Sequence, residues 1–158
     1  MSAAAEPAGT TAPAMSTEPA TSTELVTNLL LGAHATTAAV AALGARLDLS
    51  VDEWLILDAL HRADGVSMSE VSARTLASGA SLTRAVDRLV SRSLVYRSPS
   101  ATDRRKVVVR ISDLGRDLHA RMAAEVAGLE TALRSGLPSD GVDDLLAALR
   151  RIVAQTAN

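Results

Sequence analysis

Residues Ser78–Arg110 read SGASLTRAVDRLVSRSLVYRSPSATDRRKVVVR, and this stretch carries more structural information than the rest of the chain. Its first part places Leu82, Val86 and Leu89 at the spacing of one helical face, which predicts an amphipathic helix. Ser78 stands just before this pattern, where a serine can cap the N-terminus of a helix. We therefore predict a helix that begins near Ser78.

The remainder of the stretch predicts a β-hairpin with a basic turn. Residues 94–96 and 107–111 are rich in Val, Leu, Ile and Tyr, as β-strands are. Residues 98–106 between them contain Ser, Pro, Asp, Arg and Lys, which is typical of an exposed turn. A helix suited to the major groove, followed by such a hairpin, is the pattern of a winged helix-turn-helix. The alternative is a solvated charged helix beside an ordinary hairpin.

Two capping boxes of the form S-x-x-E precede this stretch, at Ser50–Glu53 and at Ser67–Glu70. Each predicts the start of a helix, because the serine and glutamate side chains satisfy each other's backbone N–H groups. Two such helices complete a helix-turn-helix. The predicted fold is therefore mainly α with a small β-hairpin wing (α+β), and the winged helix-turn-helix covers about residues 50–111.

Positive charge is concentrated in the same stretch. Eight basic and two acidic residues give residues 78–110 a local charge of +6, whereas the whole chain has a formal net charge of −2. A basic region in an acidic protein indicates a face for a polyanion, and double-stranded DNA is the expected partner. The basic residues are Arg84, Arg88, Arg92, Arg97, Arg104, Arg105, Lys106 and Arg110.

Longer amphipathic segments flank the winged helix-turn-helix. Residues 23–47 are rich in Leu and Ala, and residues 112–156 contain two helical patterns separated near Gly136–Pro138. Their apolar faces lie far in sequence from the basic stretch, so we predict a helical dimerisation region and a homodimer. The alternative is that these helices pack only on their own winged helix.

The N-terminal residues 1–22 differ in composition from the predicted domain at 23–158. They consist of small residues, Pro and Glu, with no large aliphatic side chain except Met, which predicts a disordered tail. Met15 is an alternative start to Met1. The tail has no basic region followed by an apolar core, so it is not a secretory signal. No apolar run is expected to approach a membrane span. We therefore expect a cytoplasmic protein with no membrane partner.

The residues of the basic stretch resemble the signature of the MarR family of bacterial transcriptional regulators. Two departures concern backbone geometry: Ser93 stands where the family usually has Gly, and Gly79 stands where Pro is common. A serine at position 93 is expected to strain the left-handed cap that Gly would supply. The matching residues are Thr83, Arg84, Val86, Asp87, Arg88, Leu89, Asp103, Arg105, Ser112 and Gly115.

This resemblance implies a DNA-binding surface, a dimer and a small-molecule pocket. It implies that Arg105 reaches the minor groove and that Asp103 braces it by a charge-assisted hydrogen bond. The implied effector is a small aromatic or phenolic acid. The expected DNA-binding residues are Ser78, Ala80, Ser81, Thr83, Arg84, Asp87, Arg88, Asp103, Arg104, Arg105 and Lys106. The expected pocket residues are His34, Thr37, Arg46, Trp54, Asp58 and His61, although Trp54 on an amphipathic helix is more typical of a core residue.

Catalysis, metals and cofactors are not expected. The chain has no cysteine, which excludes thiolate chemistry, and His34, His61 and His119 are far apart in sequence. Nucleophile-elbow and phosphate-binding glycine motifs are also missing from the sequence. The functional interpretation is a ligand-responsive homodimeric repressor. The alternatives are a ligand-independent DNA-binding activator and a winged-helix module that binds an acidic protein.

Overall fold

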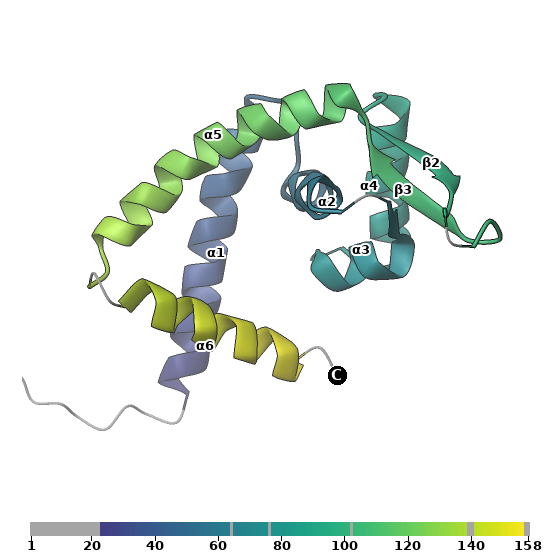
Figure 1. The fold of residues 1–158 in the computed structure, drawn as a ribbon. Helices are drawn as coiled ribbons and strands as arrows, with labels where there is room; N and C mark the ends of the chain where they lie inside the picture. The colour runs from purple at the N-terminus through teal and green to yellow at the C-terminus, as the bar shows by residue number, and fades with distance from the viewer. Residues whose placement is uncertain (1–22, 64, 76, 102, 139–140, 157–158) are drawn as a thin grey trace, which may run out of the picture.

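A computed structural model describes residues 23–63, 65–75, 77–101, 103–138 and 141–156. The predicted tail and Met15 lie outside the described residues. Figure 1 shows the helices and strands around α2 as one packed body, from which α1 and α5 extend as long arms toward α6. The elements are α1 (Glu24–Ala45), α2 (Val51–His61), β1 (Val66–Ser67), α3 (Met68–Arg74), α4 (Gly79–Ser91), β2 (Val95–Pro99), β3 (Val107–Ile111), α5 (Asp113–Ser135) and α6 (Gly141–Thr156).

Both predicted capping boxes are confirmed. At the start of α2, the Ser50 hydroxyl accepts the Glu53 N–H at 3.2 Å, and the Glu53 carboxylate accepts the Ser50 N–H at 2.8 Å. At the start of α3, the Ser67 hydroxyl and the Glu70 carboxylate make the same exchange, at 3.3 Å and 2.9 Å. Each box satisfies N–H groups that have no partner inside a helix, so both helix starts are set locally.

The wing is part of a three-stranded antiparallel sheet in the order β1-β3-β2. Strands β2 and β3 pair over their full length, from Val95 opposite Ile111 to Pro99 opposite Val107. Strand β2 is longer than predicted, since Ser98 and Pro99, which were expected in the turn, pair with β3. The short strand β1 was not predicted; it joins the other edge of β3, with Val66 opposite Val109. Two residues are too few to show an alternating pattern, so only the pairing with β3 reveals this strand.

The core is mainly aliphatic, because the chain has no Phe, one Trp and one Tyr. Helix α2 lies at its centre and contacts α3, α4, α5 and β3. Burial of these side chains provides the main driving force for the fold, at roughly 25 cal/mol for each Å² of apolar surface removed from water. The largest fully buried side chains are Ile56, Leu57, Leu60, Val66, Val71, Val86, Leu89, Val95, Val109 and Met122.

Helix α5 joins the wing to the rest of the molecule. Its N-terminal part packs on α2 through Leu118, His119 and Met122, which are all buried. Gly115 lies against Leu94, the residue before β2, and a Cβ atom at position 115 would collide with the Leu94 carbonyl oxygen. The following turns of α5 lose this contact and become exposed, as does most of α1.

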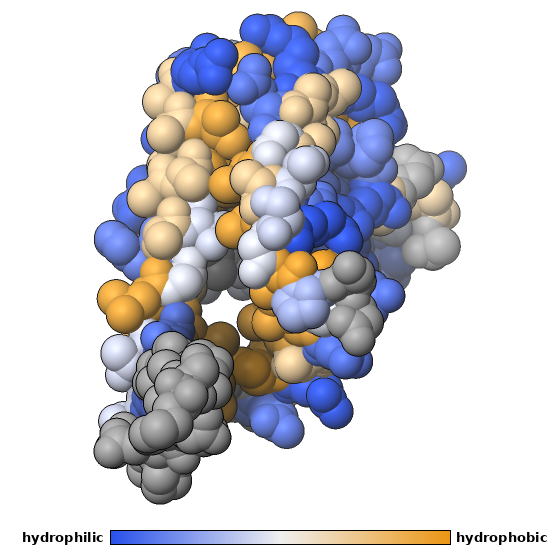
Figure 2. All heavy atoms as spheres, turned by 90° about the vertical axis from the view of Figure 1, so that its left-hand side faces the viewer, coloured by the Kyte–Doolittle hydropathy of each residue, from blue (hydrophilic) through white to orange (hydrophobic). Residues whose placement is uncertain are grey.

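The described helices leave an extensive apolar surface exposed, which we call the helical-arm surface. Figure 2 looks onto this side of the molecule and shows hydrophobic side chains running down it. Helix α1 is long and apolar enough, by length and composition alone, to cross a membrane, with a mean hydropathy of 1.4. The expectation that no apolar run approaches a membrane span is therefore wrong. The surface consists of Leu25, Val26, Leu30 and Leu31 of α1, Leu133 of α5, and Leu145, Leu146 and Leu149 of α6.

Candidate nucleic-acid interface

Helix α4 has one buried and one exposed face. Leu82, Ala85, Val86 and Leu89 are at most 3% exposed and fix the helix against the core. The opposite face is open to solvent, as a groove-reading helix requires. It carries every residue of this helix that the sequence predicts to bind DNA: Ala80, Ser81, Thr83, Arg84, Asp87 and Arg88, with Ser78 exposed just before the first turn.

The N-terminus of α4 is shaped by its own serine and glycine residues. Ser78 occupies the predicted N-cap position, but its contacts there use its backbone: the Ser81 hydroxyl accepts the Ser78 N–H at 3.3 Å and donates to the Ser78 carbonyl at 2.9 Å. Gly79 has φ +52°, in the left-handed region that a proline cannot adopt. The glycine at this position, where the family commonly has proline, therefore fits the backbone conformation of this chain.

Two charged residues on the exposed face of α4 are tied to neighbouring elements. The Arg97 guanidinium of β2 donates to the Asp87 carboxylate at 2.8 Å, which links the helix to the wing. The Arg88 Nε atom lies 3.3 Å from the carboxylate of Glu53 in α2. A shallow depression of about 440 Å³ opens beside these residues, lined by Asp52, Ser81, Arg84, Ala85, Asp87 and Arg88.

The tip of the wing presents consecutive basic residues in a braced turn. Arg104, Arg105 and Lys106 are exposed, and the Lys106 N–H donates to the Asp103 carbonyl at 2.9 Å. The Asp103 carboxylate accepts the backbone N–H of Arg105 at 3.1 Å. The sequence predicted a charge-assisted hydrogen bond between Asp103 and Arg105. In the structure, the Asp103 carboxylate binds the backbone N–H of Arg105.

A second cluster joins α2 to α5 and includes three of the six residues expected in an effector pocket. The His119 ring stacks on Trp54 with ring centres 4.9 Å apart and on His61 with ring centres 4.2 Å apart. Its Nε2 atom lies 3.2 Å from the Asp58 carboxylate, which also binds Arg62. Trp54 is 8% exposed and belongs to the core, as predicted.

The ionisation of Asp58 follows from these contacts. Partial burial raises the pKa of the Asp58 carboxyl, but the hydrogen bonds from Arg62 and His119 outweigh it and hold that pKa below its ordinary value. His119 was not among the expected pocket residues. Its spacing from Gly115, Leu118 and Met122 on α5 was the available signal, since these positions share one helical face.

The other three expected pocket residues lie elsewhere. His34 and Thr37 are exposed on α1, and no hydrogen bond or ring contact between described residues joins them to the cluster. Arg46 follows α1 and binds Glu125 of α5 at 3.0 Å, so it already has a carboxylate partner within the chain. The six residues therefore do not form one site in the described structure.

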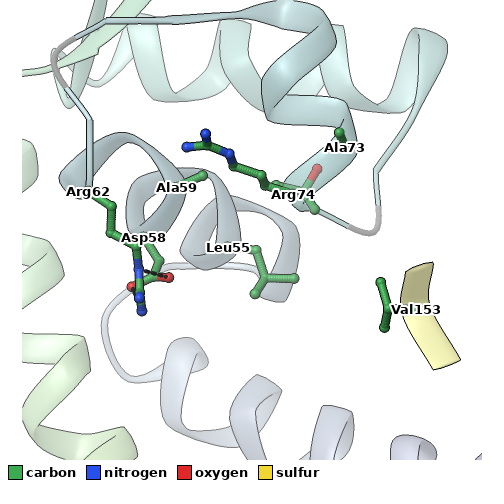
Figure 3. Close-up of a pocket in the computed structure, with 8 residues that line it drawn as sticks. Leu55, Asp58, Ala59, Arg62, Ala73, Arg74 and Val153 are labelled. Atoms are coloured by element: carbon green, nitrogen blue, oxygen red, sulfur yellow. Dashed lines mark hydrogen bonds and ion pairs between the residues drawn. The ribbon is translucent and has the colours of Figure 1, made fainter. Parts of the chain in front are cut away.

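A cavity of about 480 Å³ lies between α2, α3 and α6 (Figure 3). Asp58 and Arg62 lie together on its α2 wall, and Val153 faces it from α6. Its lining combines aliphatic side chains with Arg74 and with the ion pair between Arg62 and Asp58, which suits a small molecule with an apolar body and a polar group. The lining residues are Leu55, Asp58, Ala59, Arg62, Ala73, Arg74, Thr75 and Val153.

Comparison with known proteins matches the central part of the chain to DNA-binding regulators. The sequence profile of the MarR family matches residues 47–106. TtmR, an HTH-type transcriptional regulator of Methylorubrum extorquens, is 31% identical over 90 residues, which are 57% of this chain and 46% of TtmR. IacR, an HTH-type transcriptional repressor of Pseudomonas putida, is 34% identical over 70 residues, which are 44% of this chain and 42% of IacR. The chain spans less than half the length of these two relatives.

The likeness in fold extends further than the likeness in sequence. A solved structure of BpsR from Bordetella bronchiseptica, which concerns regulation of its DNA binding by 6-hydroxynicotinic acid, has a TM-score of 0.71 and 25% identity to this chain. It covers 85% of this chain and 97% of BpsR. Residues 47–106 thus match the MarR family, and the whole described chain shares the architecture of BpsR.

Proposed function

We propose that this chain is a sequence-specific, DNA-binding transcriptional regulator that acts as a homodimer. The observation that carries the proposal is the exposed face of α4 beside a basic wing. Arg84 and Arg88 project from the helix, and three consecutive basic residues occupy the wing tip. Because the chain as a whole has a net charge of −2, this positive surface is a local feature suited to phosphate.

The proposed complex places α4 in the major groove and the wing in the adjacent minor groove. Thr83, Arg84 and Arg88 meet bases or phosphates, and Ser78, Ala80, Ser81 and Asp87 border them. Arg105 enters the minor groove, while Arg104 and Lys106 contact phosphate. Two copies related by a two-fold axis would read a pseudo-palindromic operator, with half-sites about one helical turn, roughly 10 bp, apart.

Repression under the control of a small aromatic or phenolic acid is the proposed regulatory mode. Two relatives support it, because IacR is named as a repressor and BpsR is described as regulated by 6-hydroxynicotinic acid. In this chain, Arg74 lines the cavity between α2, α3 and α6 and would face the acid group, whereas Arg62 in the same lining is bound to Asp58. A regulator of this kind works in the cytoplasm, where its DNA is.

The test is binding of the purified protein to the DNA upstream of its own gene, titrated at two salt concentrations. We expect tight, sequence-selective binding that weakens steeply with salt, because basic side chains release counterions from phosphates. Aromatic acids added to the complex should then release the DNA.

Each other outcome supports one alternative. Selective binding that no tested acid changes would favour a ligand-independent activator or constitutive binder. Weak binding that is equal on a pool of genomic fragments would contradict the proposal and favour a winged-helix module that binds an acidic protein.

A further inference from the structure

Glu53 is a charged side chain inside the core of the winged helix. It is 4% exposed, and His119 is the other buried polar or charged residue in the described part of the chain. A carboxylate removed from water is costly unless hydrogen bonds and opposite charge compensate it. The groups that bind the Glu53 carboxylate therefore indicate which structural or functional role compensates the cost of its burial.

The two carboxylate oxygens of Glu53 serve different elements. Its Oε2 atom accepts the Ser50 N–H at 2.8 Å and completes the capping box of α2. Its Oε1 atom lies 3.3 Å from Nε of Arg88 in α4. A capping box needs only the first contact, as the exposed Glu70 shows at the start of α3. The contact between Glu53 and Arg88 connects the start of α2 to the exposed face of α4, which is the face proposed to bind DNA.

The contact with Nε leaves the outer part of the Arg88 guanidinium available. The guanidinium has five N–H donors in a planar fork, of which Nε supplies one. The Arg88 side chain is 62% exposed even though its partner is buried. Glu53 can thus hold the Arg88 side chain through Nε while most of that side chain remains exposed to solvent.

We propose that Glu53 is a positioning residue for DNA recognition, which holds Arg88 of α4 in the orientation that meets the DNA. This inference rests on the proposed DNA-binding function. An arginine loses considerable rotamer freedom when it binds. An arginine that is already oriented loses less, so its contact contributes more to affinity and to selectivity.

Net charge alone predicts the opposite effect of removing the Glu53 charge. Loss of a negative charge near the DNA would strengthen attraction to every phosphate and raise affinity for all sequences. Loss of positioning would weaken binding to the preferred sequence alone. The sign of the effect therefore distinguishes the two roles.

The experiment uses Glu53→Gln, with wild-type protein measured first on upstream DNA and on an unrelated duplex of equal length. Glutamine keeps the size of the side chain and an oxygen that can accept the Ser50 N–H, but it removes the charge that holds Arg88. We expect roughly tenfold weaker binding to the preferred DNA, unchanged or tighter binding to the unrelated duplex, and an unchanged salt slope.

Glu70→Gln is the matched control, because it makes the same change in the capping box of α3. It should leave the ratio between the affinities for the preferred DNA and for the unrelated duplex unchanged, because it removes a charge near Lys106 without releasing Arg88. In an Arg88→Ala background, Glu53→Gln should cause no further loss on the preferred DNA, since there is no arginine left to position. A purely structural role of Glu53 would persist in that background.

Arg88→Lys gives a second route if Glu53→Gln does not fold. Lysine keeps the charge but lacks Nε and the planar fork, so selectivity should fall by a similar factor. If wild-type protein shows no selective DNA binding, the proposed function itself is wrong. If wild-type protein is selective and Glu53→Gln binds the preferred DNA equally or more tightly, or Arg88→Lys binds as wild type, the positioning role is overturned.

Discussion

Ser93 and Gly115 illustrate how single residues set the junction between α4, the wing and α5. Ser93 has φ +57° and closes the C-terminus of α4, with its N–H donating to the Val90 carbonyl at 2.9 Å. The strain expected at this position is therefore present, because a residue with a Cβ atom occupies the left-handed region. Ser112 locks the same turn by donating its hydroxyl to the Ser93 carbonyl at 2.7 Å.

We predict that Ser93→Gly stabilises the protein and Gly115→Ala destabilises it. Glycine relieves the strain at position 93 but loses some chain entropy, which leaves a gain of about 0.5 to 1 kcal/mol. A methyl group at position 115 would collide with the Leu94 carbonyl and cost about 3 kcal/mol. The measurement is urea unfolding of each variant at one protein concentration. Equal stabilities for Ser93→Gly and wild type would show that the turn bears no strain.

In the wing, the two strands and the basic tip agree with the sequence prediction, but the hydrogen bond that holds the tip was not predicted in this form. The strand positions and the basic tip follow from local composition. The brace depends on one hydrogen bond, from the Arg105 N–H to the Asp103 carboxylate, which composition does not specify. Because the bond is to the main chain, its proposed role is to hold the shape of the turn.

This geometry separates two effects of Asp103 on DNA binding. Asp103→Ala removes the acceptor for the Arg105 N–H and should weaken binding roughly tenfold, in spite of the gain in net positive charge. Asp103→Asn also removes the charge but keeps an oxygen acceptor, so it should bind nearly as wild type. Binding to the preferred duplex at fixed salt provides the comparison. Tighter binding by Asp103→Ala would mean that its charge, and not the turn, matters.

At the scale of the whole molecule, the helical-arm surface is an apolar feature that nothing within the described chain covers. Leu25 and Leu30 are each 67% exposed and Leu31 is 62% exposed on the same helix. Scattered exposed leucines are ordinary, but a continuous group over α1, α5 and α6 is typical of an interface. We infer that a second copy covers this surface in the proposed homodimer.

Replacing Leu30 and Leu31 together by glutamate should shift the protein from dimer to monomer. Two buried charges without partners would make the interface unfavourable, and a monomer would bind a two-site operator far more weakly because it has a single α4. Light scattering during gel filtration gives the mass. Leu114→Glu is the control, since Leu114 is 55% exposed but lies at the start of α5, beside the wing. A monomeric wild-type protein, or one that sediments with lipid vesicles, would contradict the dimer.

Local patterns in the sequence were sufficient for most of the fold. The helical spacing at Leu82, Val86 and Leu89, the capping boxes at Ser50 and Ser67, and the basic run at 104–106 each lie within one short segment. Helix propensity, capping and turn chemistry act over a few residues, so these features can be read without knowing the partners of each segment.

The contacts between distant segments were decided by tertiary packing. His119 meets Asp58 across 61 positions of the chain, Glu53 meets Arg88 in another helix, and β1 exists only through its pairing with β3. Each depends on how the helices cross and on which faces then oppose each other. No single segment contains that information, because the packing of α2 against α4 and α5 sets it.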